Sequence, residues 1–358
     1  MIQLAKPQIG RLERGAVNRV LKSLNLAQGP EVKCFESEFS ELVDGRECVA
    51  VNSGTSALHL CLLSLGLGVG DEVIVPSFTF AASANVIRLV GATPVFVDIN
   101  PKTYCADVTS IESAITPKTK AIIVVHLYGL MADMNSIMEV AKRFNLLVIE
   151  DSAQAHLADI EGKTAGSFGD AAAFSFYPTK NMTTSEGGMA VFRNLQESRI
   201  CRLLRNQGME KRYQNEIIGF NLRMTEIEAA IGRVQLRKLE SLTSKRIENA
   251  EFLSKQLESP DTPVTPIGYR HVFHQYTVRI RSNRDDFMGS LRDAGIGCDV
   301  YYPTPVHKLK PFDIVSPLEQ TDLASDQVLS LPVHPGLTKR ELKKVAAEFN
   351  RIVCRKKK

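Results

Sequence analysis

Lys180 is the residue whose position most clearly suggests chemistry. It follows an apolar run at 171–176 and the turn Tyr177-Pro178-Thr179, so we expect its amine at the end of a buried strand. Burial lowers the pKa of a lysine and makes the neutral amine nucleophilic toward an aldehyde. Ser175 precedes it, and Gly187-Gly188 leave open space after it. Most lysines are surface residues, so the interpretation depends on what lies nearby.

Two adjacent acids, Glu150 and Asp151, end the apolar run that begins at Leu146. A carboxylate at the end of a buried strand is unfavourable unless it is paired. A carboxylate there can hold a protonated pyridine nitrogen and so keep the ring an electron sink. The alternative is a cap for a following helix, and the sequence fits both interpretations equally well.

A short polar turn, Asn52-Ser53-Gly54-Thr55-Ser56, leads from a strand at 48–51 into a helix. Free backbone N–H groups and the helix dipole favour an anion at such a position. Gly54 would allow close approach, and Thr55 and Ser56 would add hydroxyl groups. The turn predicts a phosphate cradle or, alternatively, a plain helix N-cap. Phe80 follows the strand at 72–76, where it could stack on a planar ring or simply belong to the core.

The elements that must position these residues alternate along the chain. Ligands bind at the carboxyl ends of strands in open α/β sheets, which is where the residues above fall. The strands are nearly continuous apolar runs, as expected when helices cover both faces of a mainly parallel sheet. Gly66, Gly68 and Gly70 follow a helix and precede a strand, the reverse of a dinucleotide fingerprint, so they predict a turn. Expected strands are 48–51, 72–76, 93–98, 121–126 and 146–151, and expected helices are 12–24, 31–43, 57–63, 81–90, 108–115 and 133–144.

The pattern changes after Asp170. We expect short strands at 171–176 and 189–192, a long helix at 224–257 that is broken or bent near Ser241, strands at 262–280 and 296–302, and a final helix at 338–353. The sequence therefore predicts a large α/β domain with a mainly parallel seven-stranded sheet over residues 1–240. A smaller α+β domain follows over 241–358.

Composition excludes several classes of function. The 358 residues carry a formal net charge of +4, and the basic run at 355–358 supplies an equal positive charge. The body is therefore balanced, which argues against a nucleic-acid partner, and the tail is expected to be a solvated end. The seven cysteines form no C-x-x-C pair, several lie in apolar stretches, and the dispersed histidines show no metal-ligand spacing. No signal-peptide core or membrane-length apolar run is present, so we expect a cytoplasmic protein without metal or membrane partner.

Taken together, these motifs resemble the DegT/DnrJ/EryC1/StrS family, the pyridoxal-phosphate (PLP) dependent sugar aminotransferases of the aspartate aminotransferase fold (fold type I). The resemblance covers nearly the whole chain and is far more specific than any one motif. It is carried by residues 28–32, 51–60, 76–85, 125–129, 150–156, 174–188, 219–223, 302–303, 305–307 and 329–332.

The resemblance implies a role for each candidate residue. Lys180 would form the Schiff base with PLP, and Asp151 would pair with the pyridine nitrogen. Gln154 would contact the ring hydroxyl region, and Phe80 would stack on the ring. Asn221 would reach the phosphate of a neighbouring subunit, which implies an obligate homodimer with shared active sites. The residues of this chain that would bind the phosphate are Thr55, Ser56 and Ser175.

Departures from the family pattern are modest. Ser185, Leu157 and Gln207 stand where the family usually has Gly, Gly and His, which affects the geometry of substrate-side loops. A dehydratase branch carries His at the Schiff-base position, and Lys180 argues against that chemistry.

The resemblance implies amino transfer from L-glutamate or glutamine to a nucleotide-linked keto-sugar, in amino-sugar, polysaccharide or antibiotic biosynthesis. The run 186–189 is more similar to members that act on 4-keto-6-deoxy sugars, although Tyr177 stands where many of those have His. A 3-keto sugar or an inosose is the alternative acceptor. A PLP-binding regulator without turnover is a further alternative. A nicotinamide oxidoreductase is disfavoured because the fingerprint is missing.

Overall fold

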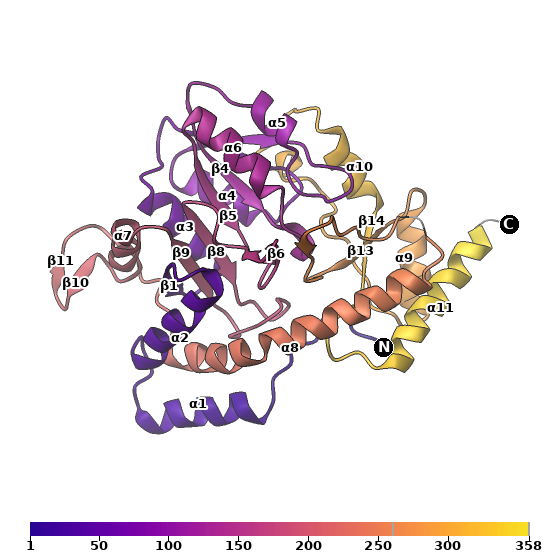
Figure 1. Cartoon of the computed structure of the whole chain (residues 1–358), viewed down its shortest axis with the longest axis horizontal. Coiled ribbons are helices and arrows are strands. Elements are labelled where there is room, and N and C mark those ends of the chain that lie inside the picture. The colour runs from indigo at the N-terminus through magenta and orange to yellow at the C-terminus, as the bar shows by residue number, and fades with distance from the viewer. Residues whose placement is uncertain (260, 357–358) are drawn as a thin grey trace.

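The computed structural model describes residues 1–259 and 261–356 and is built around a seven-stranded sheet (Figure 1). The strands lie in the order β1-β9-β8-β5-β4-β2-β3. Strands β8, β5, β4, β2 and β3 run parallel, whereas β9 is antiparallel to both β8 and β1. This confirms the predicted α/β class. The strands are β1 (Glu47–Val51), β2 (Glu72–Pro76), β3 (Thr93–Val97), β4 (Thr119–Val125), β5 (Leu147–Asp151), β8 (Ala171–Ser175) and β9 (Gly188–Phe192).

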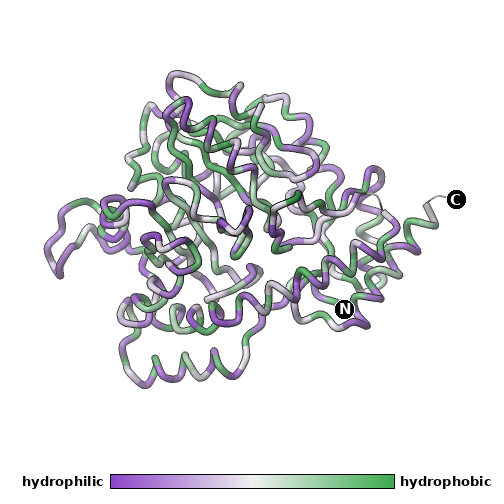
Figure 2. Tube along the Cα trace, in the orientation of Figure 1, coloured by the Kyte–Doolittle hydropathy of each residue, from purple (hydrophilic) through white to green (hydrophobic). Residues whose placement is uncertain are grey.

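Helices cover the sheet because the strands between them are apolar on both faces. Strands β8 and β9 are buried along their full length, and Figure 2 shows the central strands largely in the hydrophobic colour. Helix α3 packs against β8 and β9, and α2 and α7 pack against β1. The predicted glycine turn at 66–70 connects α3 to β2. The helices of this part are α1 (Arg11–Ser23), α2 (Pro30–Ser40), η1 (Glu41–Val43), α3 (Gly54–Ser64), α4 (Ala82–Leu89), α5 (Val108–Ser113), η2 (Leu127–Gly129), α6 (Met134–Phe144) and α7 (Leu195–Arg205).

The long helix α8 (Glu226–Gln256) links the sheet region to the C-terminal part. Thr225 caps it, with Glu228 completing a capping box. The predicted break near Ser241 is wrong, because the helix runs uninterrupted for 31 residues. Packing against α1 and α2 along one part and α11 along another outweighs the weaker helix propensity of the serines and threonines there. The helix passes through position 240, and the domain boundary placed there stays a prediction.

The C-terminal part is less regular than predicted. Strand β12 (Tyr269–Arg270) joins β6 (Asp159–Ile160) and β7 (Lys163–Thr164), and β13 (Tyr276–Arg279) pairs with β14 (Val328–Leu331). The strand region predicted at 262–280 is confirmed only in part: β12 and β13 lie within it, whereas residues 262–268 form no strand, since Pro263 and Pro266 lack the N–H that a ladder needs. The strand predicted at 296–302 is also wrong and is reduced to isolated bridges. The other elements are α9 (Arg284–Asp293), η3 (Val306–Lys308), α10 (Glu319–Gln327) and α11 (Lys339–Lys356).

A hairpin of β10 (Met209–Lys211) and β11 (Gln214–Asn215) projects from the sheet region (Figure 1). All seven cysteines are free, and five of them are buried, which confirms the expected core role of several. The predicted solvated tail at 355–358 lies outside the side chains that the structure describes. Within residues 1–259 and 261–356, no helix is long and apolar enough to cross a membrane. The cytoplasmic location stays a prediction.

Candidate active site

Lys180 lies in the turn that follows β8. Its backbone N–H donates to the carbonyl of Tyr177 at 2.9 Å, which closes the turn. Desolvation by burial lowers the pKa of the Lys180 amine to about 8, and attraction to Asp151 only partly opposes this. The predicted nucleophilic lysine is therefore near the predicted acid, and part of its population is neutral near neutral pH.

The two acids at the end of β5 have different surroundings. Glu150 accepts hydrogen bonds from His126 Nε2 at 3.0 Å and from the N–H groups of Gly166, Phe168 and Gly169. Burial raises the pKa of Glu150, but these bonds leave it below its usual value. Glu150 thus has a complete set of partners.

Asp151 has fewer partners than Glu150. It accepts from Ser83 Oγ at 2.7 Å and from the N–H of Ala153 at 3.2 Å. Burial raises the pKa of Asp151, with Ser83, Ala153 and the charge of Lys180 opposing. No helix follows β5, so the alternative interpretation as a helix cap is wrong. Asp151 is a buried carboxyl that would be ionised more easily with a cationic partner.

The start of α3 faces the end of β8. Ser53 is the N-cap, and its Oγ accepts from the N–H of Ser56 at 3.0 Å. A Cβ at Gly54 would lie 2.7 Å from Cβ of Ser175, so only glycine permits this close approach. Among the described residues, the N–H groups of Gly54 and Thr55 have no recorded partner. The N-cap interpretation is therefore correct for Ser53, and the N–H groups of Gly54 and Thr55 stay available to an anion.

Thr55 and Ser56 differ in how free their hydroxyl groups are. Thr55 is exposed, whereas Ser56 Oγ donates to Asn52 Oδ1 at 2.7 Å. Ser175 is buried at the end of β8, and its Oγ accepts weakly from the N–H of Tyr177 at 3.4 Å. The structure therefore brings the three residues predicted to bind the phosphate close together, because Gly54 lies against Ser175. Their role as phosphate ligands stays a prediction.

Gln154 and Phe80 complete the group around Asp151. Gln154 accepts from the N–H of Tyr128 at 2.8 Å and donates to the hydroxyl of Tyr302 at 3.1 Å. Phe80 is 59% exposed, with its ring centroid 6.0 Å from that of Tyr302. The core interpretation of Phe80 is therefore wrong, and Phe78 fills the core position instead. Phe80 is an aromatic face open to a ligand.

Asn221 is exposed on the segment that follows the β10–β11 hairpin. The N–H of Asn52 donates to the carbonyl of Leu222 at 3.0 Å, so this segment runs beside the turn that precedes α3. Its role at the site of a partner subunit stays a prediction.

Two residues of the site were missed at the sequence level. Ser83 binds Asp151, and Tyr302 binds Gln154. Ser83 is an ordinary serine in the first turn of α4, and Tyr302 comes from a distant loop. Both lie in runs that carry the family resemblance, 76–85 and 302–303, but their pairing with Asp151 and Gln154 has no local signal, because only the folded chain brings them to the strand ends.

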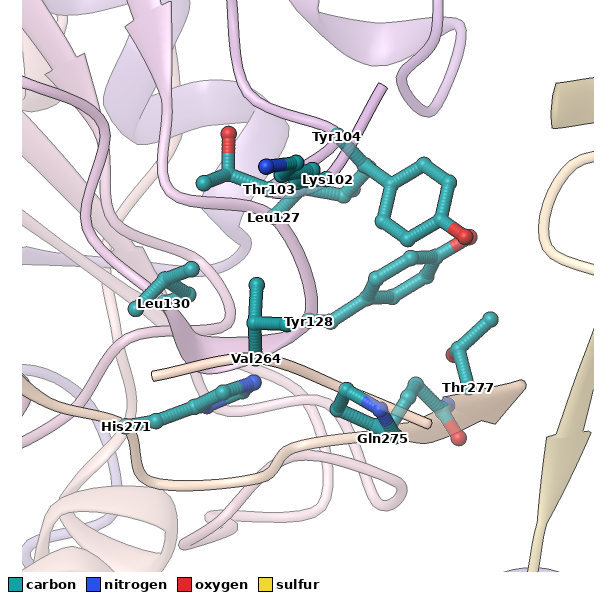
Figure 3. Close-up of a pocket in the computed structure, with 11 residues that line it drawn as sticks. Lys102, Thr103, Tyr104, Leu127, Tyr128, Leu130, Val264, His271, Gln275 and Thr277 are labelled. Carbon is teal, nitrogen blue, oxygen red and sulfur yellow. The ribbon is translucent and has the colours of Figure 1, made fainter. Parts of the chain in front are cut away.

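A separate cavity lies beside Tyr128 and contains none of the predicted site residues (Figure 3). The rings of Tyr104 and Tyr128 meet edge to face in it, with centroids 5.7 Å apart. The backbone of Tyr128 contacts Gln154, so this cavity borders the site without forming part of it. Its lining also includes Lys102, Thr103, Leu127, Leu130, Pro263, Val264, His271, Gln275 and Thr277.

Comparison with known proteins agrees with this geometry. A UDP-N-acetyl-3-dehydro-alpha-D-glucosamine 3-aminotransferase of Acidithiobacillus ferrooxidans is 40% identical over 342 residues, covering 94% of this chain and 92% of that protein. GDP-perosamine synthase of Caulobacter vibrioides is 40% identical over 365 residues, covering 98% of each chain. The crystal structure of DesV from S. venezuelae, in complex with a ketimine intermediate, superposes with a TM-score of 0.92 at 38% identity, covering 95% of this chain and 94% of that one.

The family-level match spans almost the whole chain. The model of the DegT/DnrJ/EryC1/StrS aminotransferase family matches residues 7–350. Several of the relatives are named as nucleotide-sugar aminotransferases, and both the fold and the cofactor expected from the sequence are confirmed. The chain therefore belongs to the DegT/DnrJ/EryC1/StrS family and is a PLP-dependent aminotransferase.

Proposed function

We propose that Lys180 bonds PLP through its amine and that Asp151 pairs with the ring nitrogen. The observation that carries this proposal is the joint position of an amine of lowered pKa and a buried carboxyl of raised pKa at neighbouring strand ends. Each group is poorly stabilised in its charged form by the protein alone. An aldehyde for the amine and a protonated ring nitrogen for the carboxyl would satisfy both.

The start of α3 would hold the phosphate. Support comes from the free N–H groups of Gly54 and Thr55 at this helix N-terminus, from the neighbouring hydroxyls of Thr55 and Ser56, and from the close approach of Ser175 to Gly54. Such a position attracts an anion without a charged side chain. Gln154 would contact the ring hydroxyl region, and the exposed face of Phe80 would stack on the ring.

When bound, PLP carries the amino group between the two substrates and withdraws electrons from the carbon that loses a proton. Lys180 would move that proton, because its pKa of about 8 allows it to accept and to donate near neutral pH. Asp151 would keep its negative charge against the ring nitrogen, with Ser83 fixing its orientation. Gln154 is held between Tyr128 and Tyr302 and so is already oriented before a substrate arrives.

The amino donor would be L-glutamate or glutamine, and the acceptor a nucleotide-linked 4-keto-6-deoxy sugar. The run 186–189 supports the 4-keto position, as stated above. A 3-keto sugar is the second candidate, and the relative from A. ferrooxidans named for a 3-dehydro substrate supports it. Tyr177 is exposed beside Lys180 and would face either acceptor.

The acceptor is tested with a panel of nucleotide-linked 3-keto and 4-keto sugars plus inosose. The amine of the donor carries nitrogen-15, and transfer is read by mass spectrometry. We expect the label on the 4-keto-6-deoxy sugars, with L-glutamate or glutamine as source. Label only on the 3-keto sugars or inosose would overturn the keto position. No label on any nucleotide sugar would overturn the acceptor class.

The active unit would be a homodimer in which Asn221 reaches the partner's phosphate site. Support comes from the exposed apolar side chains around the projecting hairpin, including Tyr213, Ile218 and Phe220, which a partner would cover. Mixing Lys180→Ala with Asn221→Ala chains tests this, because a mixed dimer would contain one intact site only if Asn221 acts across the interface. Activity should return on mixing, and no return would place Asn221 in its own subunit's site.

A further inference from the structure

Arg246 is a buried cation without a partner. It lies on α8 and is only 5% exposed, yet its guanidinium makes no hydrogen bond or ion pair within residues 1–259 and 261–356, and its Nε is buried without a partner. Arg205 is similarly buried, but its Nη1 lies 2.6 Å from Glu36 Oε1 and 2.6 Å from the carbonyl of Ala50. Buried charges are normally paired because desolvation is costly. Desolvation lowers the pKa of Arg246 to about 10, so it remains a cation at neutral pH.

Arg246 lines a small cavity together with Lys180. The cavity has a volume of about 10 Å³, room for about one water molecule or one small polar group. Its other walls supply amide groups from Gln8, Asn181 and Gln235, and no acid lines it. Lys6 stands exposed at its edge. The remaining lining residues are Pro7, Thr183, Leu242 and Pro335.

The acids near this cavity have other cations as partners, and Asp151 attracts the amine of Lys180. His156 and His274 are buried, and burial followed by the repulsion of Lys180 and Arg246 lowers their pKa values, that of His156 to about 3. Both imidazoles are therefore neutral. Glu13 contacts Gln235 but is held by Lys238 Nζ at 2.5 Å. Lys180 is thus attracted to Asp151, whereas no acid among the described residues compensates the guanidinium of Arg246 nearby.

We infer that Arg246 binds a carboxylate of the amino-acid donor and so holds the donor beside Lys180. This inference rests on the proposed donor. A guanidinium binds a carboxylate with two parallel N–H bonds, which would satisfy a cation that the protein leaves unpaired. At about 10 Å³ the cavity is far too small for a nucleotide diphosphate, so the donor is the substrate whose carboxylate would reach the guanidinium, with the cavity walls moving to admit it. The two substrates would therefore be recognised by different residues, and Arg246 would act only on the donor.

The inference is tested on the holoenzyme with Arg246→Met, Arg246→Lys and the control Arg237→Met. Arg237 carries the same charge on the same helix but is exposed. Glutarate, a five-carbon dicarboxylate without an amino group, is titrated calorimetrically into each protein. We expect Arg246→Met to weaken glutarate binding by about 10- to 100-fold, as for loss of charge-assisted hydrogen bonds. Arg246→Lys should lose less affinity for glutarate than Arg246→Met, and Arg237→Met should bind glutarate with the wild-type affinity.

Single-turnover spectra separate the two halves of the reaction. In Arg246→Met the change produced by L-glutamate should slow, whereas the change produced by the nucleotide-linked amino sugar should keep its wild-type rate. Equal loss in both halves, or unchanged glutarate binding, would overturn the inference. A wild-type enzyme that responds to the amino sugar but not to glutamate or glutamine would instead overturn the proposed donor. If Arg246→Met does not fold, the test uses Arg246→Lys alone. The inference would be overturned if Arg246→Lys bound glutarate as tightly as the wild type and reacted with glutamate at the wild-type rate.

Discussion

The two faces of β5 show how this protein separates structural from reactive charge. On one face Glu150 is held by His126 and three backbone N–H groups. On the other face Asp151, the next residue, has a serine and one N–H group. The first carboxylate is stabilised in its charged form and the second is not.

The same contrast distinguishes two buried arginines. Arg205 is paired with Glu36, whereas Arg246 has no partner among the described residues. A buried charge with complete partners supports the fold, and one with missing partners is available for a ligand. Lys180 belongs with the second kind, because burial lowers the pKa of its amine.

The largest expected effect comes from exchanging the two acids for amides. Asp151→Asn should lower kcat by about 100- to 1,000-fold, because a neutral amide does not stabilise a cationic ring nitrogen, with unfolding free energy unchanged. Glu150→Gln should affect stability and not kcat. Because it places an N–H₂ group against N–H donors, it should lower the unfolding free energy by about 3–5 kcal/mol, while the folded enzyme keeps its kcat. Steady-state kinetics and urea unfolding of both variants measure this. An equal loss of kcat in Asp151→Asn and Glu150→Gln would contradict the division into one reactive and one structural acid.

A smaller effect is expected for the arginines in the protein without PLP. Arg205→Met should lower the unfolding free energy by about 2 kcal/mol, because it removes a charge-assisted hydrogen bond to Glu36. Arg202, which also donates to Glu36, would compensate for this loss only in part. Arg246→Met should leave the unfolding free energy unchanged or raise it, because it removes an unpaired buried charge. Denaturant unfolding compares the two. A larger loss for Arg246→Met would show that Arg246 is structural.

The smallest effect is a pH dependence. Because the pKa of Lys180 is lowered to about 8, the neutral amine predominates above that pH and falls about tenfold per unit below it. The rate at which the apoprotein takes up PLP should therefore rise with pH and level off above about pH 8. Stopped-flow absorbance measures it. A midpoint near 10.5, the ordinary lysine value, would show that the amine is not desolvated.

How far the sequence predicts the site depends on how local its residues are. Asp151, Ser175, Lys180 and the turn before α3 directly follow apolar strands, and parallel strands end on the same edge of a sheet. Their convergence is therefore predictable. The local pattern alone does not distinguish Glu150 from Asp151, because the difference depends on which face the backbone N–H groups of residues 166–169 approach. The family resemblance, not the local pattern, pointed to Asp151.

Other features could not be predicted from local pattern. The cavity at Arg246 joins segments around Gln8, Asn181 and Pro335 that only the fold brings together. Arg246 did leave one signal, since it occupies a core position of α8 between Thr243 and Ala250. In the strand region predicted at 262–280 only β12 and β13 form, because Pro263 and Pro266 prevent a ladder over its first residues.

The most direct test of the account is to locate the bond between protein and cofactor. Borohydride reduction of the purified holoenzyme, followed by peptide mass spectrometry, fixes PLP on the amine that holds it. The account predicts one modified peptide, containing Lys180, and no modification in Lys180→Ala, which should also lose turnover. Modification of another lysine, or an unchanged turnover of Lys180→Ala, would contradict it.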